Sequence, residues 1–171
     1  MQKSEDDHHH EGLDPHVWLS VDMVKVICQN IKEQAVHIDS KNKKLYVKNY
    51  ESFIKELEQL DDEIKKTLKR SKGKKFIVFH PSFGYFAREY GLVQVAIEKE
   101  GKEPSLRYLK KIIDFAKKED IKVIFASPQF SQKSASMVAK QIGGVVKSIN
   151  PLSFEWKNNL MNVAKSFEKA N

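Results

Sequence analysis

Histidines and acids gather at the start of the chain in a combination that suits a metal ion. The opening segment MQKSEDDHHHEGLDPH holds His8, His9, His10 and His16, which are four of the six histidines in the sequence. Imidazole nitrogen and carboxylate oxygen are zinc ligands, and His-rich tracts are associated with metal binding. A purification tag is the alternative origin of such a run. Tags usually carry more histidines and a Gly/Ser-rich linker, whereas acids frame this run, so the residues favour a natural metal-attracting loop.

His80 is the other histidine in a place where chemistry is expected. It directly follows the apolar run KFIVF at 75–79, and the residues after three further apolar runs are Glu98, Ser127 and Asn150. In an open parallel sheet the ligand site lies beyond the carboxyl ends of the strands. These four side chains are therefore expected at one edge. A structural role for His80 competes with a ligand or catalytic role, and its position favours the second.

Short β-type runs alternate with helical segments after residue 72. This alternation predicts an α/β fold with a parallel four-stranded sheet flanked by helices. The predicted strands are 75–79, 93–97, 122–126 and 145–149. The predicted helices of this part are 84–90, 105–119, 131–142 and 154–169. Ser105 stands where the second of these helices needs an N-cap.

One long helix is expected before the first strand. Its apolar residues recur every three or four positions, and they are Tyr46, Tyr50, Phe53, Ile54, Leu57, Leu60, Ile64 and Leu68. Neither Gly nor Pro falls between Asp39 and Lys72, so the pattern predicts a helix of ~30 residues over about 40–70. A shorter helix is predicted to begin after Ser20. The long helix should overhang a small domain and leave Tyr46, Tyr50, Phe53 and Leu57 as candidates for exposure.

The composition is that of a globular protein with a lysine-rich surface. The chain has 171 residues, of which 40% are hydrophobic and 31% charged, enough for one substantial core. No apolar run approaches the ~20 residues that span a bilayer, and no secretory signal peptide is visible. The net charge of +7 comes mainly from lysine. Lys and Glu alternate along the helices and arginine occurs only at 70, 88 and 107, which argues against a nucleic-acid partner.

Signatures of catalysis are missing from the sequence. Cys28 is the single cysteine, which excludes an intramolecular disulfide and a Cys-based zinc site. No GxSxG motif and no glycine-rich phosphate loop occur, so a hydrolase-like enzyme has little support. His37 has no motif around it and is interpreted as a surface residue.

Five motifs, taken in order, point to a known family. The segments DPHVWLS, KFIVFHPSFGYFAREYGL, EGKEPS, KVIFASPQFS and INPL resemble those of the metal-binding lipoproteins of zinc and manganese ABC importers. The resemblance covers almost the whole chain from Asp14 onward. It implies a solute receptor, not an enzyme, that hands zinc to an ABC permease in the periplasm or otherwise outside the cytoplasm. Zinc members carry a His- and acid-rich loop shortly before DPHVW, so EDDHHHEG looks like the end of that loop.

The resemblance also implies which residues bind the metal. The histidines of DPHVW and FHPSFGYF, here His16 and His80, would bind it together with one histidine of a first lobe. Manganese members place a carboxylate at the position of His80, so zinc is expected and manganese is less favoured. A fourth ligand is often the Asp of a DPL motif, where this sequence has Asn150, a poorer ligand. Ser127 replaces a glutamate of the family. The auxiliary metal-attracting loop would consist of His8, His9 and His10.

The family pattern implies a division of the chain as well. Members have two α/β lobes joined by one long helix, with the metal between the lobes. Residues 1–19 would be the remainder of the His-rich loop and the DPHVW ligand loop, 20–72 the helical segment with the linker helix, and 73–171 the C-terminal lobe. The first lobe would be absent. Uncovered apolar side chains of the long helix should then drive self-association as a twofold dimer. The alternative is a non-transporting interaction or structural fragment of the family.

Overall fold

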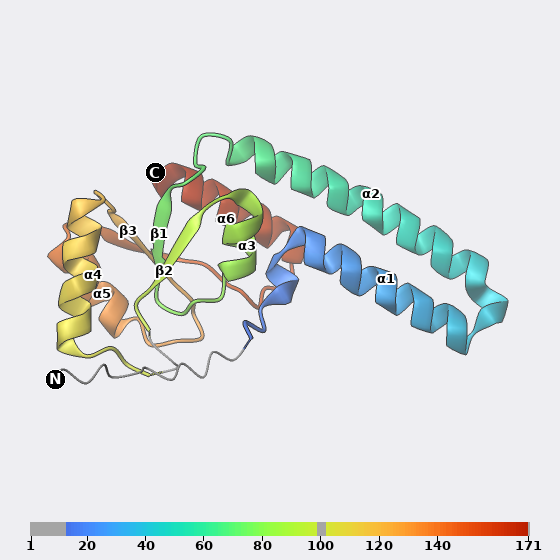
Figure 1. Cartoon of the computed structure of the whole chain (residues 1–171), viewed down its shortest axis with the longest axis horizontal. Helices are drawn as coiled ribbons and strands as arrows, with labels where there is room; N and C mark the ends of the chain where they lie inside the picture. The colour runs from blue at the N-terminus through green and yellow to red at the C-terminus, as the bar shows by residue number, and fades with distance from the viewer. Residues whose placement is uncertain (1–12, 99–101, 171) are drawn as a thin grey trace, which may run out of the picture.

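A helical hairpin projects sideways from an α/β lobe in the computed structural model, which describes residues 13–98 and 102–170 (Figure 1). The elements are α1 (Val21–Ile38), α2 (Lys43–Thr67), β1 (Lys75–Val78), α3 (Gly84–Tyr90), β2 (Val93–Ala96), α4 (Leu106–Lys118), β3 (Val123–Ala126), α5 (Lys133–Gln141), β4 (Val145–Ser148) and α6 (Trp156–Ala170). Short 3₁₀ turns, Val17–Leu19 and Ser40–Asn42, precede α1 and α2. The predicted α/β fold is confirmed, and each strand is one residue shorter than its apolar run.

The four strands of the described part of the chain are parallel and lie in the order β2-β1-β3-β4. Lys75 of β1 is opposite Val93 of β2, and Val123 of β3 is opposite Val145 of β4. A helix connects each strand to the next one along the chain, as parallel pairing requires. The four strands therefore end at one side of the sheet. The segments that follow them, 79–82, 97–98, 127–130 and 149–152, are called the carboxyl edge below.

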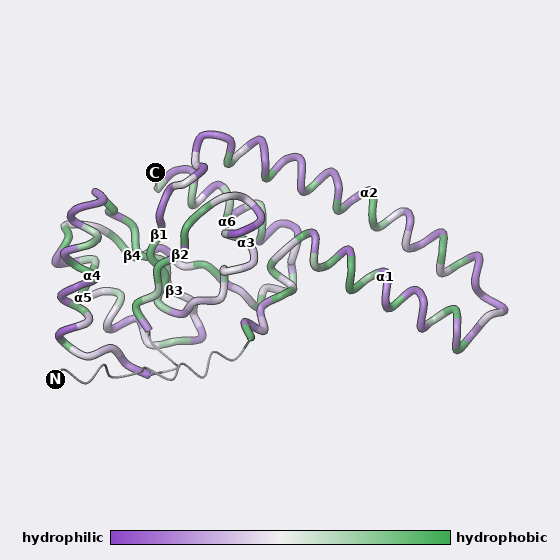
Figure 2. Tube along the Cα trace, in the orientation of Figure 1, coloured by the Kyte–Doolittle hydropathy of each residue, from purple (hydrophilic) through white to green (hydrophobic). Residues whose placement is uncertain are grey.

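Apolar side chains fill both faces of the sheet. Phe76 and Phe125 point into a layer with α2, α3 and α6, whereas Ile77 and Ile124 point into a layer with α4 and α5. This follows from the alternation of side chains along a strand. Phe167 of α6 stacks on Phe76 with ring centroids 4.1 Å apart. Figure 2 shows the strands as the most continuously hydrophobic part of the chain. The sheet is thus a rigid base for the side chains at its carboxyl edge.

The long helix pairs with α1 instead of overhanging alone. Helix α2 has 25 residues, somewhat fewer than predicted, because a 3₁₀ turn replaces its first residues. The expected exposure is wrong for Leu57, which is fully buried in the core. Tyr46, Tyr50 and Phe53 are half-buried, and with residues of α1 they line an apolar hollow. Periodicity reveals an apolar face, but it does not say which element covers that face.

Helix α1 begins where Ser20 predicts it. The hydroxyl of Ser20 accepts a hydrogen bond from the backbone N–H of Met23 at 3.1 Å, and Ser105 caps α4 in the same way at 3.2 Å. His37 is exposed near the end of α1, as predicted. Among the described residues, no helix is long and apolar enough to cross a membrane.

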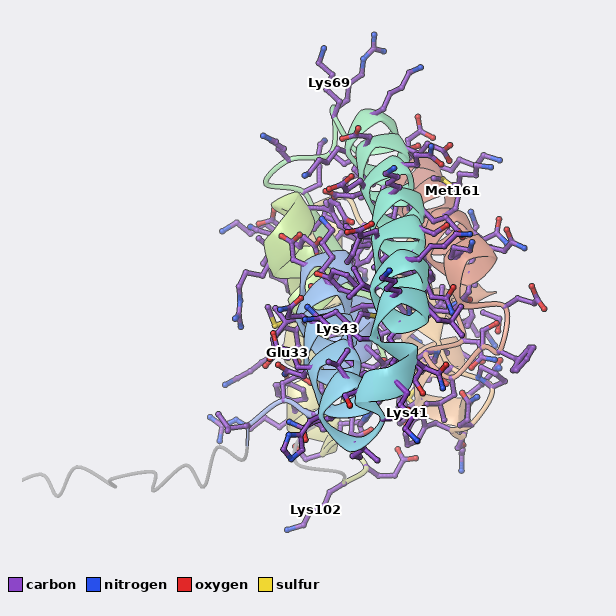
Figure 3. All side chains as sticks on the ribbon, turned by 90° about the vertical axis from the view of Figure 1, so that its right-hand side faces the viewer. Glu33, Lys41, Lys43, Lys69, Lys102 and Met161 are labelled. Atoms are coloured by element: carbon purple, nitrogen blue, oxygen red, sulfur yellow. The ribbon has the colours of Figure 1, made fainter. Side chains whose placement is uncertain are left out.

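Charged side chains cover the outside of the hairpin. Figure 3 looks onto its tip and shows Glu33, Lys41 and Lys43 pointing into solvent there, with Lys69 beyond the other end of α2. Four large apolar side chains of the hairpin are nevertheless exposed, namely Val26, Ile31, Ile38 and Leu45. These residues, and not the predicted stripe of α2, are the exposed apolar part of the hairpin.

Candidate metal centre

The ring of His16 is fixed by the carboxylate two residues before it. Nδ1 of His16 lies 2.7 Å from Oδ1 of Asp14, and the backbone N–H of His16 donates to the same oxygen at 3.0 Å. An ionised carboxylate only accepts, so Nδ1 carries the proton and Nε2 is the nitrogen left for a ligand. Asp14 can lie here because Gly84 has no side chain. A Cβ at Gly84 would be 2.7 Å from Oδ2 of Asp14.

Trp18 attaches the His16 loop to the lobe. Its indole N–H donates to the carbonyl of Pro151 at 2.9 Å, and the indole N–H of Trp156 donates to the carbonyl of Trp18 at 2.7 Å. The rings of His16 and Trp18 are tilted to each other, with centroids 5.3 Å apart. The position of His16 is therefore determined by the segment that joins β4 to α6.

His80 lies on the carboxyl edge and is held by residues that follow two other strands. Nδ1 of His80 is 3.0 Å from Oε2 of Glu98, which follows β2 and is buried. The ring of Phe130, which follows β3, stacks on His80 at a centroid distance of 4.4 Å. The carboxylate again selects the tautomer with the proton on Nδ1. His80 and His16 consequently present the same ring nitrogen, Nε2.

The two imidazoles lie edge to face, with ring centroids 5.3 Å apart. Two imidazoles bound through nitrogen to one tetrahedral zinc ion, with Zn–N distances of about 2.05 Å, have ring centroids roughly 5.2 Å apart. The side chains are 15% exposed for His16 and 22% for His80, so solvent reaches the pair. Neither Nε2 has a hydrogen-bond partner in the described part of the chain. The spacing fits two ligands of one metal ion.

Asn150 and Ser127 lie on the same edge but belong to a turn network. Oδ1 of Asn150 accepts hydrogen bonds from Nε2 of Gln129 at 2.7 Å and from the backbone N–H of Leu152 at 3.0 Å. The hydroxyl of Ser127 donates to Oε1 of Gln129. The oxygen of Asn150 is therefore already used, and Gln129 links Asn150 to Ser127.

The described residues bring two candidate metal ligands together and no larger group. Within 13–98 and 102–170, no group of three or more His, Cys, Asp or Glu side chains is placed to hold a metal. His8, His9 and His10 lie outside the described residues. His16 and His80 are therefore the two candidate ligands in this part of the chain, and a four-coordinate zinc ion would need further donors beside them.

Sequence reasoning missed the residues that support the two histidines. Asp14 stands inside the DPHVW motif. Its place two residues before His16 is the sequence signal that could have identified its role as the partner of that ring. Glu98 was expected at the carboxyl edge, but its pairing with His80 depends on β2 lying beside β1. Gly84 left no signal, because only the folded chain brings it against Asp14.

Comparisons with known proteins agree on one group of relatives. A family model described as zinc-uptake complex component A, periplasmic, matches residues 1–166. The chain is 39% identical over 143 residues to the high-affinity zinc uptake system protein ZnuA of Bacillus subtilis, covering 82% of this chain and 45% of that protein. It is 34% identical over 150 residues to the zinc-binding lipoprotein AdcA of Streptococcus pneumoniae, covering 86% and 30%.

The fold has a solved counterpart. A crystal structure of a ZnuA superimposes with a TM-score of 0.90 at 43% identity, covering 92% of this chain and 62% of that one. The chain thus spans less than half the length of these two curated relatives and about three fifths of the solved structure.

Proposed function

The chain belongs to the family of periplasmic zinc-uptake components, and we propose that it is the zinc-binding lobe of a solute receptor that supplies an ABC permease. Because it spans less than half of its curated relatives, the transport activity of the whole receptor is part of this proposal. Those relatives are named for zinc uptake and as a zinc-binding lipoprotein. We therefore place the protein outside the cytoplasmic membrane, as a receptor and not as an enzyme.

The observation that carries the proposal is the orientation of the two histidines. Each Nδ1 is held by a carboxylate, Asp14 for His16 and Glu98 for His80. Such a partner fixes the ring and makes the opposite nitrogen a stronger donor. Imidazole suits zinc, whereas manganese prefers oxygen ligands. The metal is cargo here, and an open pair of ligands at the surface suits a protein that must also release it.

A zinc titration in competition with a chromogenic chelator tests the assignment. The full chain should bind zinc, and both His16→Ala and His80→Ala should weaken binding by at least about tenfold, since each removes one ligand. His37→Ala is the matched control, because His37 is exposed and distant from the pair along the fold. Equal affinities for His80→Ala and His37→Ala would refute the site.

The alternative is a fragment that kept the fold without binding zinc. It is favoured by the turn network, in which the replacement residue Asn150 uses its oxygen for Gln129 and Leu152. The same titration separates the two functions. A lobe without a zinc function should show only weak binding that is insensitive to changes at His16 and His80.

We also propose that the chain self-associates through the hairpin, by a surface other than the predicted apolar stripe of α2. Ile31, Ile38 and Leu45 are exposed on α1 and α2, and burying exposed apolar side chains favours association. Such association needs no metal. Sedimentation with and without a chelator should therefore give the same result if the hairpin is the contact.

A further inference from the structure

Positive charge is concentrated where the long helix joins the lobe. The stretch from 65 to 75, called the basic segment below, holds seven cations, namely Lys65, Lys66, Lys69, Arg70, Lys72, Lys74 and Lys75. The remaining lysines and arginines of the chain equal its 23 acids in number, so the net charge corresponds to this one segment. The helix dipole favours cations in the last turn of α2, but most of the basic segment lies beyond the end of α2 at Thr67.

Most of this charge is not neutralised by the fold. Within the described residues, ion pairs join the basic segment to acids at its two ends only, Lys65 to Asp61 at 2.6 Å and Lys75 to Glu119 at 2.8 Å. The cations between these two lysines are all exposed. Figure 3 shows Lys69 extending into solvent beyond the end of α2. Like charges that are held this close repel one another, so the segment suits an anionic partner.

The backbone of the basic segment is fixed to the lobe. The N–H of Ser71 donates to the carbonyl of Leu68 at 2.8 Å, and Ser71 itself is buried. The N–H of Gly73 donates to the carbonyl of Gly91 at 2.7 Å, which ties the turn to the end of α3. The cations are therefore presented on one corner of the lobe, and a partner can bind them without the cost of ordering this backbone.

A hollow of about 420 Å³ lies between the basic segment and α3. Four cations line it, namely Lys65, Lys69, Lys72 and Arg88. Glu89 lines it as well, but its Oε1 accepts the backbone N–H of Asp22. Lysine binds phosphate as a point charge, and basic pockets of this kind suit the phosphate of a lipid headgroup.

We propose that the basic segment and this hollow dock the chain on a bilayer surface that contains anionic phospholipids. The choice of a membrane rests on the proposed function, which places the protein beside an ABC permease. A protruding corner fits a flat surface, whereas a linear polyanion is held in a groove that follows its backbone. Clusters of about four to eight Lys or Arg residues bind anionic headgroups, each contributing roughly fivefold in affinity.

This contact leaves the candidate metal centre free. Lys75 is the first residue of β1, and His80 follows the other end of the same strand. The basic segment and the carboxyl edge therefore lie at opposite ends of the sheet. Attachment to a membrane through the basic segment does not cover the histidine pair, and it needs no metal.

Flotation of the full chain with lipid vesicles, in the presence of a chelator, tests the proposal. The chain should bind vesicles of about 40% phosphatidylglycerol in phosphatidylcholine, because their surface carries the anionic headgroups that lysine clusters bind. Binding should fall steeply as salt is raised from about 50 to about 500 mM, since salt screens exposed charges. Vesicles of phosphatidylcholine alone should bind at least about tenfold less.

The triple variant Lys69→Gln, Arg70→Gln, Lys72→Gln should bind the anionic vesicles roughly a hundredfold more weakly, at about fivefold per cation. All three side chains are exposed, so the fold should be unaffected. Its zinc affinity should equal that of the parent chain, because the carboxyl edge is unchanged.

The matched control is the triple variant Lys41→Gln, Lys43→Gln, Lys44→Gln. It removes the same charge from exposed positions at the hairpin tip, where Figure 3 shows Lys41 and Lys43. This variant should bind the anionic vesicles like the parent chain, since the hairpin tip lies far from the basic segment (Figure 1).

Several results would overturn membrane docking. Equal losses in the two triple variants would attribute binding to net charge alone, and equal binding to phosphatidylcholine vesicles would exclude the headgroup charge. Release from the vesicles by inorganic phosphate at constant ionic strength would assign the hollow to the free ion. Tighter binding to a single-stranded oligonucleotide at the same salt would assign the segment to a soluble polyanion. All of these leave the zinc titration unaffected, whereas zinc binding indifferent to His16 and His80 would refute the proposed function and leave the vesicle results unchanged.

Discussion

His16 and His80 lie with ring centroids 5.3 Å apart, although one precedes α1 and the other follows β1. Their closeness depends on two separate attachments. Trp18 fixes the His16 loop to the segment after β4, and Glu98 fixes His80 from the end of the neighbouring strand. The pair is therefore positioned by the sheet, which would lower the cost of ordering these two side chains around a metal ion.

Glu98→Gln should weaken zinc binding without unfolding the lobe. Loss of a carboxylate that holds a ligating histidine typically costs about 10–100-fold in metal affinity, because the tautomer and orientation are no longer fixed. Competition titration measures the effect. Glu155→Gln, at an exposed position of the turn before α6, is the control and should bind zinc like the parent chain. Equal affinity for both variants would remove Glu98 from the site.

Gly84→Ala should disturb His16 through Asp14. The added Cβ would lie 2.7 Å from Oδ2 of Asp14, so the carboxylate must move and release its hold on Nδ1. We expect several-fold weaker zinc binding and an unchanged or slightly raised Tm, since alanine favours the helix that begins here. A double-mutant cycle with Asp14→Ala provides the check. If Gly84→Ala weakened binding equally with and without Asp14, the proposed route would be wrong.

The sequence predicts the fold well because its signals are local. Alternating apolar runs and helical stretches locate every strand, and the caps Ser20 and Ser105 mark two helix starts. The partner of a helix face is a non-local property, and for that reason Leu57 was expected in solvent but lies in the core. The pairing of α2 with α1 leaves no periodic signal of its own.

The candidate site, like the fold, has a part that local sequence signals predict and a part that depends on non-local contacts. His16 and His80 are predicted as candidate ligands from motifs and from the rule for strand ends. Their carboxylate partners depend on which strands are neighbours and on the close approach of Gly84 to Asp14, both of which appear only in the folded chain. Asn150 was predicted only as a poorer ligand, by analogy with an aspartate, and its oxygen accepts two hydrogen bonds in a turn.

Gly144→Ala should destabilise the lobe more than Gly143→Ala does. A Cβ at Gly144 would lie 2.2 Å from the backbone carbonyl oxygen of Lys122, so β4 must separate from β3, at about 3 kcal/mol. Gly143 has φ of +63° and open space around it, so alanine there costs about 1 kcal/mol of backbone strain. Urea denaturation of both variants measures the difference. The reverse order would contradict the described close approach.

Glu89 of α3 contacts the start of α1 and should make the free energy of unfolding depend on pH. Its Oε1 accepts the backbone N–H of Asp22 at 3.1 Å, while Oε2 is buried and has no hydrogen-bond partner in the described residues. Burial raises the pKa of this carboxyl, against the lowering effect of the Ser20 and Asp22 hydrogen bonds, and nearby Asp22 and Asp61 raise the pKa further.

The free energy of unfolding should therefore carry an identifiable contribution from Glu89. Between the ordinary Glu pKa of about 4.3 and the raised value, the folded chain binds more protons than the unfolded one, so this contribution falls as pH rises. Glu89→Gln removes the titration, and its stability relative to the parent should increase from pH ~4 to pH ~7. Urea unfolding across this range measures it. A difference that stayed flat, as expected for the exposed control Glu155→Gln, would contradict the raised pKa.

Nitrogen NMR of the histidine rings tests the central claim most directly, because it identifies the atom that binds the metal. Before zinc is added, His16 and His80 should show the tautomer with the proton on Nδ1, as their carboxylate partners require. On addition of zinc, Nε2 of both rings should shift while both Nδ1 protons remain, and His37 should be unchanged. Shifts confined to other histidines, or coordination through Nδ1 of either ring, would contradict the assignment of His16 and His80 as the zinc ligands.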